Sequence, residues 1–335
     1  MPDGGKETQH RKAVGRRRRG GSLPPVRTSR GDKLRVFDCF TFSEERALLL
    51  ARLRYLDGVV DHFVIAEADR THQGSPRTLV LPELRDQLSP YWSKIVFVRV
   101  DDLPDGSAWD RENHQRDALL RGLDLADPDD LVIVSDVDEI PRRDTIHELR
   151  SSLHGPVALG MRMSYYSLNL QSDDPWTLAK VGRAADIISP QALRMEKGHP
   201  VIPDAGWHVS YLGAVGDVQK KLRSFAHTEY AGPAWTSERH IRRSMRLGVR
   251  IFGDGLFSVV DDARTFPGIS RDAHPEFFQR PLNPLQRLWA RLYLRLTTHR
   301  ERLPLPLVDL APILALPLIP ALELLDRIRR WSRSR

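Results

Sequence analysis

The chain has 335 residues, enough for one large or two ordinary domains with a sizeable core. Hydrophobic residues make up 41% and charged residues 28%, which is normal for a globular protein. Cys39 is the only cysteine, which excludes an intrachain disulfide and fits a reducing compartment.

The net charge of +7 is concentrated at the two ends of the chain. Residues 1–31 are predicted to be a disordered basic tail. Its arginines are not followed by an apolar run, so no signal peptide or N-terminal anchor is expected. Such tails are either solvated chain or attracted to anionic lipid or another polyanion. No nucleic acid is expected as a partner, because the tail has no interleaved aromatic residues.

Short apolar runs alternate with amphipathic stretches in the first half of the chain. Strands are predicted at residues 34–38, 59–66, 94–100 and 131–134, and helices over residues 44–57 and 111–123. Thr41 and Glu44 have capping-box spacing and predict the start of the first helix. Pro141 suits the first turn of the helix after the fourth strand. This alternation predicts an α/β fold with a mostly parallel sheet that is covered on both faces.

The second half of the chain has a weaker pattern. Residues 164–262 are richer in aromatic residues, histidine and glycine, and we interpret them as the rest of the same domain. A helix is predicted over residues 282–296. Residues 303–325 are very apolar, but their five prolines argue against a straight membrane-spanning helix.

Acidic residues follow each predicted strand, which is where ligands bind in open α/β sheets. They are Asp38, Glu67, Asp101, Asp102, Asp136 and Asp138. Carboxylates gathered at one edge of a sheet would do little to stabilise a fold, but they would hold a cation.

The strongest motif is Asp136-Val137-Asp138, directly after the apolar run 131–134. In extended chain, residues i and i+2 point to the same side. Two carboxylates so placed would bind one hard divalent cation such as Mg²⁺ or Mn²⁺, which can neutralise a diphosphate leaving group. Phosphatases of the haloacid-dehalogenase type also carry Asp-x-Asp after a buried strand. They expect Thr or Val two residues after the second Asp, where this chain has Ile140.

The sequence also resembles glycosyltransferase family 17 over about residues 36–254. The blocks that carry this resemblance are Phe-Asp-Cys-Phe-Thr-Phe at 37–42, Val-Asp-His-Phe-Val-Ile-Ala-Glu-Ala at 60–68, Thr-His-Gln-Gly at 71–74, Gln-Arg at 115–116, Ser-Asp-Val-Asp-Glu-Ile-Pro at 135–141, Gly-Trp-His-Val-Ser-Tyr at 206–211 and Lys-Leu-Arg-Ser-Phe-Ala-His-Thr-Glu at 221–229. Their combination and order are more specific than any single block. Asp117 departs from the pattern, since the family usually has Asn there.

The resemblance implies a single GT-A-like nucleotide-sugar-binding domain with a mostly parallel mixed sheet over residues 32–265. Residues 266–335 lie outside the resemblance, and their own composition predicts a helical, Pro-rich apolar extension with a basic end. It implies a metal-dependent inverting glycosyltransferase with Mn²⁺ or Mg²⁺ as cofactor. The donor would be a nucleotide sugar, with UDP-GlcNAc favoured, and the acceptor a hydroxyl group of a glycan.

Several residues in these blocks are predicted to bind the donor. Asp136 and Asp138 would hold the metal, and Asp136 would also face the donor. Arg116 would pair with a phosphate, since its guanidinium makes two parallel hydrogen bonds. The other donor-binding candidates are Asp38, Glu67, which would accept from a nucleobase or ribose, and His208 and His227, which would complete the metal shell or donate to the diphosphate. Each of them has a purely structural alternative.

Inverting transfer needs a general base within hydrogen-bonding reach of the acceptor hydroxyl. The candidates are Glu229, Asp204 and Asp217, and Glu229 is favoured because it belongs to the block at 221–229. Trp207 would stack on a sugar or pack in the core.

Two other functions compete with glycosyl transfer. One is a phosphohydrolase with Asp136 as its nucleophile, and the other is a non-catalytic glycan-binding protein at a membrane surface. A cytoplasmic location is expected, with peripheral contact to the inner face of a membrane through residues 303–325 and the arginines that follow them.

Overall fold

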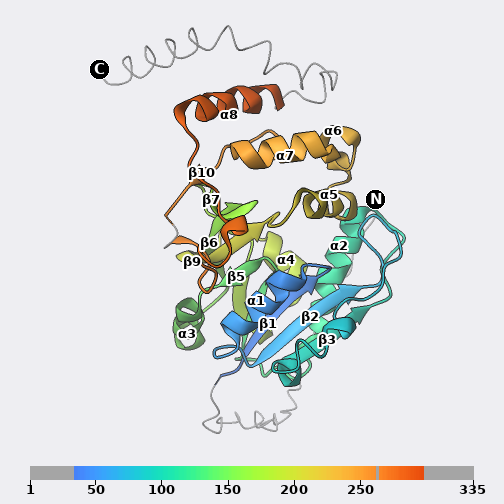
Figure 1. Cartoon of the computed structure of the whole chain (residues 1–335). Coiled ribbons are helices and arrows are strands. Elements are labelled where there is room, and N and C mark those ends of the chain that lie inside the picture. The colour runs from blue at the N-terminus through green and yellow to red at the C-terminus, as the bar shows by residue number, and fades with distance from the viewer. Residues whose placement is uncertain (1–33, 262–263, 298–335) are drawn as a thin grey trace, which may run out of the picture. The chain divides into compact units, whose positions relative to one another are not determined.

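The computed structural model describes residues 34–261 and 264–297. These residues form a mixed α/β fold around a ten-stranded sheet (Figure 1). The strands are β1 (Val36–Phe42), β2 (His62–Ala68), β3 (Ile95–Val100), β4 (Leu131–Asp136), β5 (Glu139–Pro141), β6 (Val157–Tyr165), β7 (Ser167–Gln171), β8 (Lys180–Arg183), β9 (Val201–Ser210) and β10 (Ser258–Val259).

The helices lie between and after these strands. They are α1 (Arg46–Leu56), α2 (Ala108–Asp117), α3 (Arg143–Ser152), α4 (Pro190–Met195), α5 (Val215–Ser224), α6 (Pro233–Thr236), α7 (Glu238–Leu247) and α8 (Pro284–Thr297). Short 3₁₀ turns are η1 (Pro82–Leu84), η2 (Trp92–Lys94), η3 (Ala118–Gly122), η4 (Ala184–Asp186), η5 (Thr228–Tyr230) and η7 (Pro275–Phe277).

The first half of the sheet is parallel, in the order β3-β2-β1-β4. The strands β1, β2 and β4 are buried on both faces, whereas the edge strand β3 is partly exposed. In β1, Phe40 packs with Leu53 of α1, while Cys39 faces Leu119 of η3 and Leu193 of α4. The four predicted strands and the covered α/β arrangement are therefore confirmed for this half.

The second half of the sheet is mostly antiparallel. β8 pairs antiparallel with β4 and β6, β7 pairs antiparallel with β6, and only β9 runs parallel to β6. Tyr166 alone connects β6 to β7, with φ at 65°, and so short a connection can join only antiparallel strands. The prediction of a mostly parallel sheet is thus correct only for β1 to β4.

Three local predictions are wrong. Thr41 does not cap the first helix, because it lies inside β1, and α1 begins at Arg46 without a side-chain cap. The second helix begins at Ala108, earlier than predicted, with a capping box built on Ser107. Pro141 ends the short strand β5, and α3 follows at Arg143.

The described part of the predicted C-terminal extension packs onto the rest of the fold. Phe266 and Phe278 belong to the main hydrophobic core, and Tyr293 of α8 is hydrogen-bonded to His240 of α7. Within the described residues, no helix has the length and apolarity needed to cross a bilayer. The predicted basic tail at 1–31 and the apolar segment at 303–325 lie outside the described residues, so disorder and membrane contact stay predictions.

Candidate active site

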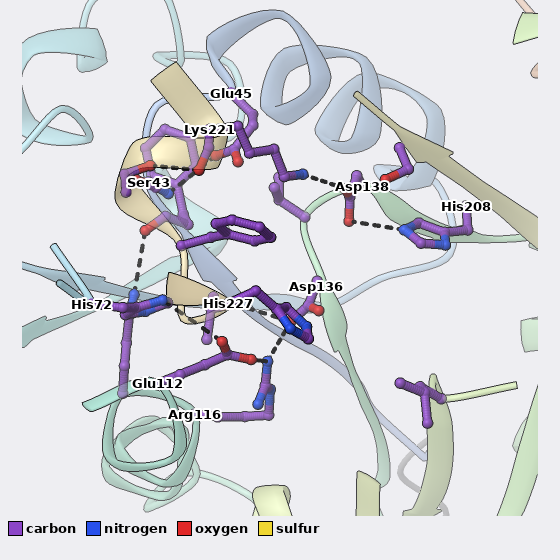
Figure 2. Close-up of a pocket in the computed structure, with 18 of the residues that line it drawn as sticks. Ser43, Glu45, His72, Glu112, Arg116, Asp136, Asp138, His208, Lys221 and His227 are labelled. Carbon is purple, nitrogen blue, oxygen red and sulfur yellow. Dashed lines mark hydrogen bonds and ion pairs between the residues drawn. The ribbon is translucent and has the colours of Figure 1, made fainter. Parts of the chain in front are cut away.

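A cavity of about 680 Å³ lies at the carboxyl ends of β1 and β4 (Figure 2). This is the edge at which ligands bind in open α/β sheets. Its walls come from the ends of the two strands and from α2, α4, α5 and β9. The structure brings five predicted site residues together here, namely Arg116, Asp136, Asp138, His208 and His227.

Asp136 ends β4 and is held between two arginines. Its Oδ1 accepts hydrogen bonds from the Thr41 hydroxyl (3.1 Å) and from Arg116 Nη2 (3.0 Å), and its Oδ2 accepts one from Arg194 Nη2 (2.6 Å). Burial raises the pKa of the Asp136 carboxyl, but the Arg194 and Arg116 charges outweigh it and lower this pKa well below its usual range. Asp136 is therefore ionised at neutral pH.

Asp138 lies in the turn between β4 and β5 and faces a different cation. Its Oδ2 accepts a hydrogen bond from Lys221 Nζ (3.0 Å). Its Oδ1 lies 3.7 Å from His208 Nε2, beyond hydrogen-bonding distance. Burial raises the pKa of the Asp138 carboxyl, but Lys221 and His208 outweigh it, so the net shift is strongly downward. The carboxylate is charged, and Oδ1 remains available to a ligand.

Glu139 and Arg194 form a buried ion pair that supports Asp136. Arg194 of α4 makes a bidentate pair with Glu139, with both N–O distances at 2.7 Å, while its Nη2 also reaches Asp136. Glu139 accepts further hydrogen bonds from the Asp136 backbone N–H and from Trp176 Nε1. Arg194 thereby fixes the position of Asp136 from the side opposite Arg116.

Asp38 does not reach the cavity, although the sequence suggested that it binds the donor. Its side chain is fully buried and forms a bidentate pair with Arg52 of α1, at 2.6 and 2.9 Å. Arg52 also donates to the backbone carbonyls of Asp136 (2.8 Å) and Glu139 (2.7 Å). The pair therefore shapes the turn that carries Asp138, and Asp38 has no surface left for a ligand.

Glu67 is likewise buried and does not line the cavity. Its carboxylate accepts hydrogen bonds from the backbone N–H groups of Val80 and Leu81 and from Arg77. Burial raises the pKa of Glu67. These hydrogen bonds and the Arg77 charge lower it, but the net shift is upward. The predicted contact of Glu67 with a nucleobase or ribose is therefore wrong. Its carboxylate instead anchors the loop after β2.

Loss of the buried Arg52 guanidinium should destabilise the fold strongly. We expect Arg52→Ala to lower the free energy of unfolding by about 3–5 kcal/mol, because Asp38 is left as an uncompensated buried charge. Arg46→Ala is the matched control on the same helix. Its pair with Glu83 is half exposed, so a change of at most ~1 kcal/mol is expected. Urea unfolding of both variants measures the difference, and equal losses would contradict this account.

His227 lines the cavity, whereas Glu229 does not. Glu229 Oε1 accepts from His227 Nδ1 at 2.8 Å, and both side chains are about half exposed. Burial raises the pKa of Glu229, but the hydrogen bond from His227 outweighs it and lowers this pKa. Trp109 of α2 packs edge-on against the His227 ring. Glu229 therefore orients His227 and does not itself reach a ligand in the cavity.

The other two predicted bases also lie outside this cavity. Asp204 of β9 is exposed and pairs with Arg142 and Arg162. Asp217 of α5 accepts a hydrogen bond from the Ala214 backbone N–H (2.8 Å), as a residue in the first turn of a helix does. Trp207 is 2% exposed and packs against Phe266, so it is a core residue.

The charge of the cavity favours an anionic ligand. Six cationic side chains line it against four carboxylates. The cations are Arg70, Arg77, Arg116, Arg194, Lys221 and Arg250, and the carboxylates are Glu45, Glu112, Asp136 and Asp138. Such an excess suits a diphosphate, whose oxygens accept hydrogen bonds from guanidinium and ammonium groups.

The paired carboxylates fit a divalent cation that shares its shell with a ligand. Within the part of the chain that the structure describes, no cluster of three or more His, Cys, Asp or Glu is arranged to hold a metal ion. Mg²⁺, however, is usually bound by one or two carboxylates together with substrate phosphates. Asp138 Oδ1 is open to such an ion, and buried His208 Nδ1 has no hydrogen-bond partner among the described residues.

Sequence reasoning missed Arg194, Glu45 and Trp109. Arg194 lies in a six-residue helix 58 positions after Asp136, and nothing in its surroundings marks it as a site residue. Lys221 belongs to the block at 221–229, but the sequence indicates no role for it. Its place opposite Asp138 follows only from the packing of α5 over the cavity.

Comparison with known proteins agrees with this picture. A sequence profile of glycosyltransferase family 17 matches residues 26–272. Two curated relatives, from Rattus norvegicus and Homo sapiens, are named beta-1,4-mannosyl-glycoprotein 4-beta-N-acetylglucosaminyltransferase, and each is 33% identical over 144 residues. The match covers 39% of this chain and 27% of each relative, so it spans about a quarter of their length.

Among solved structures, the chain is similar to a mannosyltransferase from Pyrobaculum calidifontis in complex with GDP-Man and Mn²⁺. The match covers 90% of this chain and 84% of the other, at 14% sequence identity and a TM-score of 0.33.

The fold and the cavity define an α/β protein with a carboxylate pair in a cationic site. The family profile covers well over half of the 335 residues, and the chain therefore belongs to glycosyltransferase family 17. It is thus an enzyme of glycosyl transfer. Membership favours this function over the aspartate-based phosphohydrolase and over the non-catalytic binding protein.

Proposed function

We propose that this enzyme is a metal-dependent inverting glycosyltransferase with a GT-A-like domain. It moves N-acetylglucosamine from UDP-GlcNAc to a hydroxyl group of a glycan. The observation that carries this proposal is the pair Asp136 and Asp138 on one wall of a cavity with an excess of cations. The relatives' names support the choice of sugar, because they are N-acetylglucosaminyltransferases.

In this proposal each charged residue of the cavity has a task. Asp138 and Asp136 would hold Mn²⁺ or Mg²⁺, which would supply positive charge to stabilise a diphosphate leaving group. Arg116 and Lys221 add positive charge beside the same phosphates. His208 faces the same site, because its Nε2 lies 3.7 Å from Asp138 Oδ1.

A panel of nucleotide sugars tests the proposal. Purified enzyme with Mn²⁺ and mixed glycan acceptors should release UDP from UDP-GlcNAc faster than nucleotide from the other donors, and EDTA should abolish this release. Proton NMR of the glycan product should show a new β-linkage from the α-linked donor. Nucleotide release that is insensitive to EDTA would contradict the metal role, and an α-linked product would contradict inversion.

A further inference from the structure

A second cavity of about 440 Å³ adjoins the first. It lies between the start of α1 and one side of α5. The two cavities share part of their lining, namely Ser43, Glu45, Tyr211, Lys221 and Ser224. Ligands bound in the two cavities would therefore be neighbours, because both would contact these five side chains.

The lining of the second cavity suits a neutral saccharide. Hydroxyl, carboxylate and ammonium groups are supplied by Ser43, Asp217 and Lys220, and aromatic rings by Tyr211 and Phe277. A sugar ring requires polar groups that bind its hydroxyls and an aromatic ring that covers its apolar face. The first cavity, by contrast, is dominated by cations.

Of the four carboxylates in the first cavity, one has no cation paired with it. Asp136 pairs with two arginines and Asp138 with Lys221, as described above. Glu112 pairs with Arg116 at 3.0 Å and lies 3.7 Å from His72. Glu45 makes no ion pair among the described residues, and it is the one carboxylate of the four that also lines the second cavity.

The Glu45 side chain is fixed at one oxygen and open at the other. Its Oε2 accepts hydrogen bonds from the backbone N–H groups of Ser43 (3.3 Å) and Glu44 (3.0 Å). Its Oε1 accepts none from the described residues. Figure 2 shows Glu45 beside Lys221, whose ammonium group is bonded to Asp138. An oriented carboxylate with a free oxygen at the boundary between two ligand sites is placed to take a proton.

We propose that the second cavity binds the acceptor sugar and that Glu45 is the general base of the transfer. This inference rests on the function proposed above. The acceptor oxygen forms a bond to the anomeric carbon of the donor, and its proton passes to Glu45 Oε1. The bond between that carbon and the diphosphate breaks, and its electron pair leaves with the diphosphate. Entry from the second cavity suits inversion, which needs the attacking and leaving oxygens on opposite sides of the carbon.

Glu45→Gln tests the role of the carboxylate. Loss of a general base typically costs 10²- to 10⁴-fold, so we expect kcat for transfer to fall about a thousandfold. The affinity for UDP with Mn²⁺ should stay within about twofold of wild type, and Glu45→Asp should recover part of the rate. Glu238→Gln is the matched control. Its carboxylate is exposed, pairs with Arg242 and lies outside both cavities, so its kcat should be close to wild type.

Ala47→Trp tests the second cavity separately. Ala47 is exposed at the start of α1 and lines only the second cavity, so an indole there should raise KM for the acceptor at least tenfold while UDP affinity holds. Retained transfer by Glu45→Gln would overturn the inference, as would an unchanged acceptor KM in Ala47→Trp. If wild type releases nucleotide from no donor, the proposed function itself fails.

Discussion

Asp138→Asn and Asp136→Asn should each lower kcat for transfer about a thousandfold. Each substitution removes a negative charge from the site proposed to hold the cation behind the diphosphate leaving group. A loss of ~4 kcal/mol in transition-state stabilisation corresponds to that factor. Asp138 should be the more sensitive residue, because its Oδ1 is open, whereas both oxygens of Asp136 already accept hydrogen bonds from arginines.

Steady-state kinetics with and without Mn²⁺ measures this effect. Wild type should lose its rate in EDTA, and the two variants should gain little when Mn²⁺ is restored. Asp102→Asn is the matched control. Asp102 also follows a strand, but it pairs with Arg121 outside the cavity, so its rate should stay within about twofold of wild type. Equal metal stimulation in all the proteins would show that neither carboxylate holds the ion.

Arg194→Lys should lower kcat about a hundredfold although the charge is kept. A lysine cannot reproduce the bidentate pair with Glu139 and reach Asp136 at the same time, because the guanidinium fork has a fixed geometry. Asp136 would then lose its fixed position. The Mn²⁺ concentration for half-maximal rate should rise at least tenfold, which a general loss of stability would not cause.

Arg242→Lys is the control for this substitution. Arg242 lies on α7 and pairs only with exposed Glu238 among the residues that the structure describes. Its rate and metal requirement should match wild type. If Arg194→Lys shows an unchanged metal requirement, Arg194 serves the fold and does not position Asp136.

The parallel half of the fold could be predicted because its strands are uninterrupted apolar runs. Residues 131–134 lead through Ser135 into Asp136, and this position at a strand end identified two of the four carboxylates that line the cavity. The antiparallel half could not be predicted in the same way. Its pairing depends on short connections such as Tyr166, whose backbone conformation the sequence does not reveal.

Asp38 shows why a carboxylate at a strand end is not always a ligand. Arg52 shares the buried face of α1 with Leu49, Leu53 and Leu56. An arginine within an apolar stripe requires a buried partner, and Asp38 is that partner. This signal was present in the sequence, since Arg52 precedes Leu53 and falls three residues after Leu49. It predicts a buried acidic partner for Arg52, and the structure identifies that partner as Asp38.

Lys221, Arg194 and Glu45 show what the sequence could not give. They come from separate helices or loops and meet only when α4 and α5 pack around the end of β4. No local pattern links residues so far apart in the chain. Glu229 illustrates the converse. Its block suggested a base, but its carboxylate lies outside the cavity and is hydrogen-bonded to His227.

The most direct test of the account is the equilibrium binding of UDP by isothermal titration calorimetry. Wild type should bind UDP with Mn²⁺ present, and its affinity should fall at least tenfold in EDTA. Asp138→Asn should bind with that lower affinity whether or not Mn²⁺ is added. Tight binding of UDP by wild type in EDTA, or by Asp138→Asn to the same degree as wild type, would contradict a metal-dependent nucleotide site at Asp136 and Asp138.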